Sequence, residues 1–593
     1  MINVLYILLL TLISCGLGKR LLGKHVQGLS PAEGSVFSIG LGLGALAFIM
    51  LALGVAGLLH FSLVISLLLI LCVCFYRDIG EFVRELISGV RRVDHKKISL
   101  FEKILLIILF SAFFFSLIGA LAPPTGNDAL AYHLQHPRIF LENHTIAHIP
   151  YTRESLWPYL TEMLFTLGML LRGPVLAKLF HYLFGLLSTL AVFCLARRCA
   201  GKKTGILASV LFYLSPGIFM QASYAYVDLV LCFYVFCSVY LFFLWAADKK
   251  NGTLVFSGIF MGLALSVKVL AGMALIPMLI LLLWELSRGR QRSGEKRSSF
   301  LMFLMPAVLP SSVWYARSFL VTGNPVYPFM HNIFSGGWES NLGADMGHIK
   351  GFIGFLRLPW DLVMHAKDFG GEQIGFLFLS LLPCLVFVDW KNKINRRMGV
   401  FILLYTVIWF AVDPNIRFLF PVFPIIFLLI ACGLNKLISR GFVFLRAVVI
   451  AGLLFNLALA FYYNVPAVKL LSGNISEEEY LSQNERTYNT AEWVNDNLGN
   501  DSLLIVAGEP RLLYFKAQTL EYTIVNRVCE GDEGRIDAVF RQEMVPYKNV
   551  YILISGYKPD QYINNRIKKK EPVFTTSFTE DGRHIHYSIF RLK

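Results

Sequence analysis

Charged residues are scarce in this sequence of 593 residues, because Asp, Glu, Lys and Arg together make up 16% of it while 56% is hydrophobic. A soluble globular protein averages roughly a quarter charged residues. The apolar residues also come in long runs, and a run of about 18 or more is typical of a transmembrane helix. The composition therefore excludes a soluble enzyme, a secreted disulfide scaffold and a disordered protein.

Cysteine motifs and nucleotide-binding glycine loops are missing as well. Nine of the ten cysteines lie in or beside apolar runs, only Cys529 lies in the polar tail, and no spacing matches a zinc site. The segment Gly508–Arg511, which follows an apolar strand, lacks the GxGxxG fingerprint of dinucleotide sites. The first residues lack the basic stretch of a cleaved signal, so residues 2–18 are predicted to form a retained helix.

About fourteen apolar runs are present, and each is predicted to be helical because lipid offers the backbone no hydrogen-bond partner. They lie near 2–18, 34–58, 60–76, 104–122, 175–196, 204–220, 225–247, 253–267, 269–286, 300–321, 374–389, 399–412, 416–435 and 442–462. Seven groups of Lys and Arg each follow an odd-numbered run, the densest at 288–297. Basic loops stay in the cytoplasm. The N-terminus, the long loops 123–174 and 322–373 and the tail 463–593 are therefore predicted to lie outside.

The net charge of +15 at pH 7 first suggests a nucleic-acid binder. The tail 463–593, however, holds 16 basic and 18 acidic residues, a net of −2, which leaves +17 for the membrane part. This excess lies in the predicted cytoplasmic loops, where it orients the helices beside anionic lipids. Nucleic acid is not expected as a partner.

The tail itself is predicted to be a small α/β domain outside the membrane. Residues 502–507 and 550–554 are short apolar segments typical of buried parallel strands, and 490–494 is predicted to be part of a helix before the first of them.

The segment Pro123–Arg138 is the most informative part of the predicted outer side. Pro123 and Pro124 end a membrane helix, so Asp128 lies within a few residues of the membrane surface. A carboxylate in this position can take a proton from an acceptor hydroxyl or amine, or help to bind a divalent cation. It can also simply cap the amphipathic helix that the pattern from Asp128 to Phe140 predicts.

Four motifs, all on the predicted outer side, resemble a known family. They are Asn127–His133 with Pro137–Arg138, Tyr226–Leu229 at the start of a helix, Gly323–Phe329 at a helix exit, and Arg417–Pro424 before a late helix. In this order they resemble the GT-C glycosyltransferases that use lipid-linked sugars. The resemblance covers roughly 104–525 and is closest to the bacterial family 39 enzymes, which include protein O-mannosyltransferases and the aminoarabinose transferase that acts on lipid A.

The resemblance implies an activity as well as a fold. The donor would be a polyprenyl-phosphate sugar, the acceptor would attack the anomeric carbon, and the phosphate would leave. The first outer-loop aspartate of the family, its candidate catalytic base, falls on Asp128. The acceptor would be a lipid, a glycan or a protein, and the sequence identifies neither it nor the sugar.

Other outer residues are candidates for the same site. Asp228 and Glu154 are further catalytic candidates, although Asp228 is also placed to cap its helix and Glu154 to be a solvated loop residue. The leaving phosphate needs positive charge, which is rare on this side. The remaining candidates are for substrate binding: Tyr132, His133, Arg138, Tyr226, Lys268 and Arg417. Arg417 is favoured because a planar guanidinium can pair with two phosphate oxygens, whereas Lys268 in a tight turn can also be explained by snorkelling.

A divalent metal cation is the one cofactor that the sequence suggests. Asp345 and His348, three residues apart in the loop 322–373, would share a helix face. In related enzymes a residue from this region can join a metal site. The sequence lacks a recognised metal signature here, and a polar surface loop would have the same composition.

The prediction is thus a polytopic α-helical GT-C-like protein with three parts. Residues 1–103 form extra N-terminal helices, 104–462 the catalytic membrane domain, and 463–593 the outer α/β domain. The predicted location is the inner (plasma) membrane. A transporter or flippase of lipid-linked glycans is the alternative, but the candidate residues lie in outer loops rather than midplane helix breaks, and no internal repeat is evident. A non-catalytic scaffold would leave Asp128, Asp228 and Arg417 unexplained.

Overall fold

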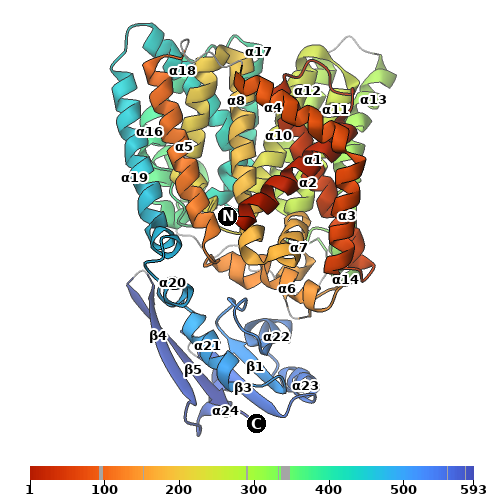
Figure 1. Cartoon of the computed structure of the whole chain (residues 1–593), viewed down its shortest axis with the longest axis vertical. Helices are drawn as coiled ribbons and strands as arrows, with labels where there is room; N and C mark the ends of the chain where they lie inside the picture. The colour runs from red at the N-terminus through yellow and green to blue at the C-terminus, as the bar shows by residue number, and fades with distance from the viewer. Residues whose placement is uncertain are drawn as a thin grey trace.

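The computed structural model describes residues 1–91, 98–150, 152–288, 292–330, 333–334, 348–529, 531–556, 559–580 and 582–593. Most helices run along one direction and form a bundle, and the C-terminal domain lies against one end of it (Figure 1). The predicted fold class, a helical membrane bundle with a small α/β domain, is confirmed.

The bundle and its short helical turns have the following bounds: α1 (Ile2–Leu22), α2 (Pro31–Val55), α3 (Phe61–Cys74), α4 (Tyr76–Arg91), α5 (Leu100–Leu121), η2 (Ala129–His133), α6 (Gln135–Glu142), η3 (Arg153–Leu156), α7 (Leu160–Arg172), α8 (Pro174–Tyr213), α9 (Pro216–Gln221), α10 (Asp228–Asp248), α11 (Asn251–Val267), η4 (Val269–Ala271), α12 (Gly272–Arg288), α13 (Ser293–Val308), α14 (Ser312–Thr322), α15 (Gly351–Met364), η5 (Ala366–Phe369), α16 (Phe376–Leu381), η6 (Leu382–Phe387), α17 (Lys393–Val412), η7 (Ile416–Val422), α18 (Phe423–Ser439) and α19 (Leu445–Leu471).

Within the described residues, nine helices are long and apolar enough to cross a membrane, or up to 11 if each of two bent pairs is one span. The bent pairs are α3 with α4 and α13 with α14. The sequence predicts about fourteen, and the difference has physical causes. The 40-residue α8 is two helices that meet at a kink, where Ala200 and Gly201 leave helical φ/ψ values, so two predicted segments are counted there as one span. The other two predicted segments correspond to the shorter apolar helices α11 and α16–η6.

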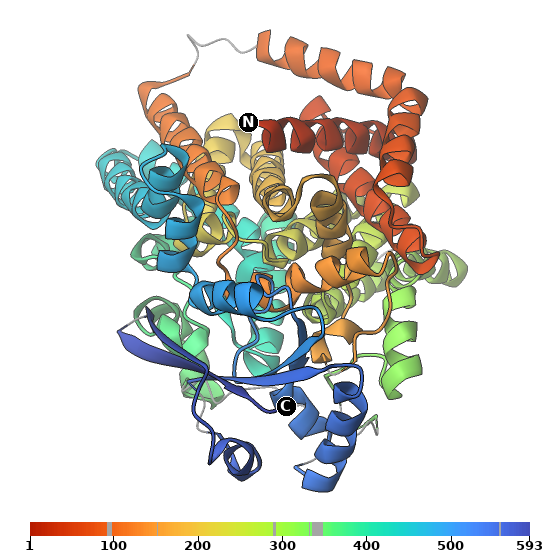
Figure 2. The ribbon, with the colours of Figure 1, turned by 60° about the horizontal axis from the view of Figure 1, so that its bottom comes forward.

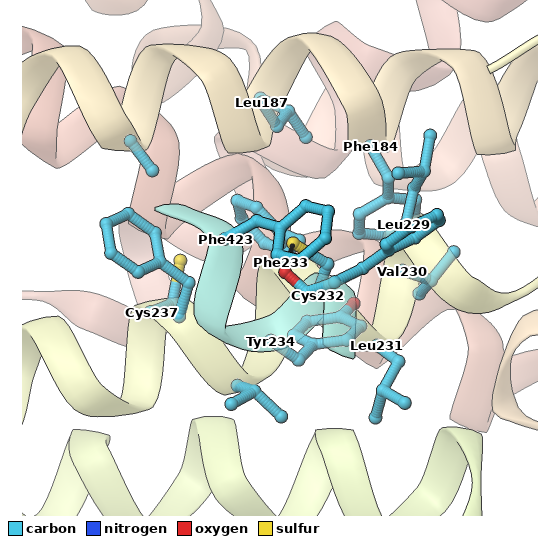
Figure 3. Close-up of a cluster of buried hydrophobic side chains, with 14 of the residues drawn as sticks. Phe184, Leu187, Leu229, Val230, Leu231, Cys232, Phe233, Tyr234, Cys237 and Phe423 are labelled. Carbon is cyan, nitrogen blue, oxygen red and sulfur yellow. Dashed lines mark hydrogen bonds between the residues drawn. The ribbon is translucent and has the colours of Figure 1, made fainter. Parts of the chain in front are cut away.

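Helix α10 is the centre of the bundle. Its sequence is apolar on every side, which is the pattern of a helix surrounded by protein. Of its most apolar stretch of 18 residues, 94% is buried inside the protein. Figure 3 shows side chains of the segment Leu229–Tyr234 packed with Phe184 and Leu187 of α8 and with Phe423 of α18. Because α10 is fixed by packing along its whole length, its first residue, Asp228, is held in a defined place.

The N-terminal helices pack on one flank of the bundle, while α5 and α19 lie side by side on another (Figures 1 and 2). Helices α1 and α2 approach closely at glycines. A Cβ atom added at Gly42 would overlap the backbone carbonyl of Ser14, and one added at Gly18 would overlap that of Ser38. Small residues allow such close backbone contact between membrane helices.

The C-terminal domain contains α20 (Glu477–Asn484), α21 (Tyr488–Asn497), β1 (Ser502–Ala507), β2 (Gln518–Glu521), α22 (Tyr522–Val528), α23 (Glu533–Met544), β3 (Asn549–Ser555), α24 (Gln561–Ile567), β4 (Phe574–Glu580) and β5 (Arg583–Arg591). The strand order is β2-β1-β3-β5-β4. The predicted parallel pairing of β1 with β3 is confirmed, with Leu504 opposite Tyr551. The strands β5 and β4 extend the sheet as an antiparallel hairpin.

The glycine contact between α1 and α2 can be tested by adding bulk. Gly42→Val should destabilise the protein by about 1–3 kcal/mol, because overpacking forces the helices apart. Gly34→Ala, also in α2, is the matched control, since a Cβ there meets no atom within 4 Å. The stability of both variants can be compared by their melting temperatures in detergent. Equal melting temperatures for the two variants would contradict the close packing.

Candidate active site

The N-terminal end of α10 places the first carboxylate of the site. Asp228 is the first residue of α10 and is only 1% exposed. A carboxylate is favourable in the first turn of a helix. The next residue, Leu229, donates its backbone N–H to Nε2 of His181 at 3.0 Å, and Nδ1 of His181 bonds to the Gln221 carbonyl at 2.9 Å. His181 thus satisfies a free N–H at the helix start, as expected for a structural histidine.

Asp128 lies in the first predicted outer loop, between α5 and the π-helical turn η2. Its side chain makes no capping hydrogen bond to the described backbone, so the simple capping explanation does not hold. Its backbone N–H instead donates to the hydroxyl of Tyr226 at 3.4 Å. π-helical turns are rare and occur frequently at functional sites. The turn and Tyr226 together orient the Asp128 carboxylate toward α10 and η7.

Arg417 is positioned by a tight turn before η7. The side chain of Asn415 accepts a hydrogen bond from the Arg417 backbone N–H at 3.0 Å, and the carbonyl of Asn415 accepts one from Nε1 of Trp409 at 2.8 Å. Gly370 packs against this asparagine with a φ of +94°, where a Cβ would come within 2.5 Å of Nδ2. Only glycine adopts this conformation readily and leaves the space. The loop that carries Glu372 therefore lies against the turn at Asn415, which directly precedes Arg417.

These segments bring one arginine to three carboxylates. Nη1 of Arg417 lies 2.7 Å from Oδ2 of Asp128 and 3.8 Å from Oδ2 of Asp228, and its Nε lies 3.2 Å from Oε1 of Glu372. Nζ of Lys268 lies 3.2 Å from Oδ1 of Asp228. The five side chains form the ion cluster, a name kept below. Arginine suits such a site because it presents several donors and keeps its charge.

Two aromatic rings lie against the cations of the cluster. The guanidinium carbon of Arg417 is 5.4 Å from the ring centre of Tyr226, and Nζ of Lys268 is 4.2 Å from that of Phe418. Rings in these positions attract cations through their electron-rich faces. They also shield the charges from water, which strengthens the ion pairs.

Asp128 and Glu372, the two carboxylates of the ion cluster that lie outside the membrane-spanning segments, have different pKa values. Burial alone would raise the pKa of Asp128, but the Arg417 guanidinium, with His133 and Lys268, outweighs burial and lowers it below the usual value. Burial raises the pKa of Glu372 to about 7, because Arg417 only partly opposes it and the charges of Asp228 and Asp128 add to it. Asp128 is therefore ionised at neutral pH, while Glu372 takes up and releases a proton near pH 7.

A cavity of about 230 Å³, called the small cavity below, lies on one side of the cluster. Asp128, Lys268 and Arg417 line it together with apolar side chains such as Leu270 and Phe329. Its lining combines these two cations with four carboxylates, those of Asp128, Glu154, Glu162 and Asp413, and with an apolar wall.

A second cavity of about 490 Å³, called the large cavity, lies on the Glu372 side. Tyr224, Tyr226 and Glu372 line it from the bundle, and Arg511 and Glu580 line it from the C-terminal domain. The cluster thus stands between two cavities, with Asp128 and Arg417 facing the small one and Glu372 facing the large one.

The structure brings most of the sequence-predicted residues together. Tyr132, His133 and Glu154 line the small cavity with Asp128, Lys268 and Arg417, whereas Tyr226 lines the large one. The ring of Tyr132 lies 5.6 Å from that of Trp157 in an edge-on contact. Nδ1 of His133 bonds to Oε1 of the buried Glu162 at 2.6 Å. The Glu162 carboxylate thus holds the imidazole of His133 in place beside Asp128.

Arg138 has a different place from the one that the sequence suggests. Its Nη1 donates to the backbone carbonyls of Leu513 and Phe515 at 2.7 and 2.6 Å. The same strap of the C-terminal domain, residues 511–515, also donates from the Leu512 N–H to the Leu130 carbonyl at 3.2 Å. Arg138 therefore attaches the C-terminal domain to the first outer loop and does not line either cavity.

Two more hydrogen bonds continue this attachment. Nε of Arg511 donates to Oδ1 of Asn127 at 2.8 Å, and the hydroxyl of Tyr514 donates to the Pro124 carbonyl at 2.8 Å. The strap thus contacts the outer loop on both sides of Asp128.

The metal prediction finds no support in the described part of the chain. Asp345 lies outside the described residues, and the ring of His348 packs between Phe369 and Phe410, at 5.5 and 5.7 Å. Among the described residues no group of three or more His, Cys, Asp or Glu is placed to hold a metal ion. Arg417 and Lys268 already neutralise Asp128 and Asp228, so these carboxylates do not fit a cation site.

Sequence reasoning missed Glu372 as a member of the site. It appears in the sequence as one of several acidic residues in a polar loop, without a motif around it. The Gly370-Gly371 pair just before it was the available signal, because both glycines have positive φ and mark a tight loop.

Comparison with known proteins agrees with this geometry. Residues 168–333 match the family model for dolichyl-phosphate-mannose-protein mannosyltransferases. The crystal structure of apo ArnT from Cupriavidus metallidurans superposes with a TM-score of 0.52 at 16% identity, over 82% of this chain and 97% of that one. The chain therefore shares the fold of ArnT. The resemblance identified from the sequence is confirmed.

Other matches are more distant or less informative. ArnT from the same organism bound to undecaprenyl phosphate gives a TM-score of 0.50 at 15% identity, with the same coverage of 82% and 97%. An uncharacterized protein of Shigella flexneri is 28% identical over 149 residues, which are 25% of this chain and 79% of that protein. An oligosaccharyltransferase from Archaeoglobus fulgidus, in complex with Zn and sulfate, has a TM-score of 0.43 at 13% identity over 81% of this chain and 72% of that one, too distant to carry an argument about metal.

The contact of Arg138 with the strap can be tested directly. Arg138→Ala removes two charge-assisted hydrogen bonds, so the backbone of residues 511–515 should exchange its amide hydrogens faster. Arg172→Ala, an exposed arginine at the end of α7, is the matched control. Hydrogen–deuterium exchange with mass spectrometry measures both. Unchanged exchange in the strap of the Arg138 variant would show that the contact does not hold the domain.

Proposed function

We propose that the protein is an integral-membrane glycosyltransferase that moves a sugar from a polyprenyl-phosphate donor to an acceptor at the outer membrane face. The ion cluster carries this proposal, because it places two cations and a carboxylate around a cavity at the membrane surface. The family match and the shared fold support it. No comparison supports the alternative of a transporter or flippase.

The small cavity fits the donor. A sugar phosphate on a polyprenyl chain is an anion with a hydrocarbon tail, and Lys268 and Arg417 offer the charge while Leu270 and Phe329 offer an apolar wall. Buried cations that are already oriented bind a phosphate strongly and stabilise it as it leaves. ArnT has been crystallised with undecaprenyl phosphate. We propose that the small cavity binds a ligand of the same class.

Asp128 is the proposed base. A hydroxyl of the acceptor attacks the anomeric carbon, the bond from that carbon to the phosphate oxygen breaks, and polyprenyl phosphate leaves. The hydroxyl proton passes to a carboxylate of the site. When the donor phosphate takes up the Arg417 guanidinium, Asp128 loses part of its ion pair and becomes a better proton acceptor. Asp228, which Lys268 and Arg417 contact, is proposed to hold these cations in place rather than to react.

The remaining sequence-predicted residues have supporting roles in this proposal. Tyr132, His133 and Glu154 line the small cavity and are proposed to contact the donor sugar, and Tyr226 lines the large cavity. The divalent metal is not needed for any step, because Arg417 and Lys268 supply the positive charge.

The plasma membrane is the proposed location, with the C-terminal domain on its outer face. The seven basic groups of the sequence support this orientation. Helix α4, which carries several arginines, lies at the end of the bundle away from the C-terminal domain (Figure 1).

The proposed reaction can be tested with purified protein in lipid nanodiscs. Asp128→Asn should lower the release of polyprenyl phosphate from a polyprenyl-phosphate sugar by about 100-fold or more, because general-base catalysis contributes roughly 10²–10⁴. Asp361→Asn is the matched control, since Asp361 is buried and paired with Arg357 and His365 but does not line either cavity. Near-normal turnover by the Asp128 variant would rule out this role.

The orientation can be tested by labelling single cysteines in intact cells. A membrane-impermeant maleimide should label Lys367→Cys, in the predicted outer loop, and should not label Lys391→Cys in a predicted cytoplasmic loop. Both lysines are exposed, and the unsubstituted protein gives the background from its own cysteines. Labelling of Lys391→Cys alone would invert the topology.

A further inference from the structure

We infer that the large cavity is the acceptor site and that it takes a neutral, hydroxyl-rich sugar rather than a peptide or an anionic group. This inference rests on the proposed function and extends it, because it names the class of acceptor. Cavities of roughly 300–1,000 Å³ commonly hold one small ligand, and this cavity of about 490 Å³ lies within that range.

The first observation concerns charge. The ionised side chains that line the large cavity have partners within the protein. Nζ of Lys178 donates to the carbonyls of Gly119 and Ala122 at 2.9 and 2.7 Å, with that of Pro123 at 3.5 Å. Arg511 pairs with Glu580 at 3.2 Å, and Glu372 pairs with Arg417 at 3.2 Å. Lys178 and Arg511 are cations while Glu372 and Glu580 are carboxylates, so the charged side chains of the lining cancel and the cavity offers no net charge to a charged ligand.

The second observation concerns two oxygen atoms without partners. Oε1 of Gln221 and Oε2 of Glu372 are buried and accept no hydrogen bond from any described residue. Gln221 is only 3% exposed, and both residues line the large cavity. A buried acceptor without a donor is costly, so these two atoms indicate a ligand that brings hydrogen-bond donors. Hydroxyl groups bring such donors without bringing charge.

The third observation concerns the rings and amides of the wall. The rings of Tyr224 and Tyr226 stack with centres 5.4 Å apart and an angle of 30°, which gives an apolar surface on which a sugar ring can lie. The amide side chains of Asn127, Gln373 and Asn484 also line the cavity. An extended peptide, by contrast, is commonly recognised by pairing with several residues along the edge of a sheet, whereas the edge strand β4 contributes only its last residue, Glu580, to this wall.

The position of the cavity fits the reaction. A sugar hydroxyl that donates to Oε2 of Glu372 lies on the opposite side of Arg417 from the small cavity, where the donor is proposed to bind. When the new bond to the anomeric carbon forms, the hydroxyl proton has Glu372 and Asp128 as neighbouring carboxylates, and polyprenyl phosphate leaves on the other side. The C-terminal domain supplies Arg511 and Glu580 to the wall, so the acceptor site is complete only with this domain in place.

Binding of simple probes to the full-length protein in nanodiscs tests this inference without any turnover. Saturation-transfer NMR with a panel of neutral methyl glycosides should show binding, and glucose 6-phosphate and a Ser/Thr-containing peptide should not compete. Gln221→Met, which removes the unpartnered carbonyl at similar volume, should weaken glycoside binding about 5-fold, as expected for one hydrogen bond. Gln135→Met is the matched control, because Oε1 of Gln135 is also buried and unpartnered among the described residues but lies outside both cavities.

The outcomes separate the two proposals. Glycoside binding that falls only in the Gln221 variant supports the inference, even if no donor turns over. Binding of the peptide or the phosphate probe in place of the glycosides overturns it, and so does absence of glycoside binding or an equal loss in both variants. Release of polyprenyl phosphate, measured separately, decides the proposed function. Where turnover is present, the neutral glycosides should increase it and carry the transferred sugar in mass spectra.

Discussion

The ion pair between Arg417 and Asp128 is the contact on which the outer end of this protein depends. A charge that is largely removed from water is costly unless it is paired and hydrogen-bonded. Arg417 meets this requirement with carboxylates from three separate segments: the first outer loop, the start of α10 and the loop before α16. The guanidinium therefore fixes how these segments sit relative to one another. The same pairing leaves one cation between two cavities.

The two outer carboxylates of the cluster show how one arginine creates two environments. Asp128 lies at 2.7 Å from Nη1 and its pKa is lowered, whereas Glu372 lies at 3.2 Å from Nε and burial raises its pKa to about 7. The difference follows from how completely the guanidinium compensates each group for lost water. A site built in this way keeps one carboxylate charged beside the small cavity and another ready to exchange a proton beside the large cavity.

The C-terminal domain is part of the same construction. Its strap, residues 511–515, is hydrogen-bonded to the outer loop on both sides of Asp128, and two of the domain's residues line the large cavity. A loop that carries the carboxylate proposed as the base must be held to within a fraction of an ångström. The domain supplies part of that support from outside the membrane, which gives a physical reason for an α/β unit at the end of a helical bundle.

The sequence by itself determined the parts that depend on local hydrophobicity and on rare charges. Helix α10 could be predicted because it is apolar on every side, and Asp128, Asp228 and Arg417 because charges beside outer helix ends are few. Only the tertiary structure decided which charges meet, since 289 residues separate Asp128 from Arg417. It also gave Arg138 a structural contact and brought in Glu372, because pairing depends on how distant loops converge, and no local pattern records that.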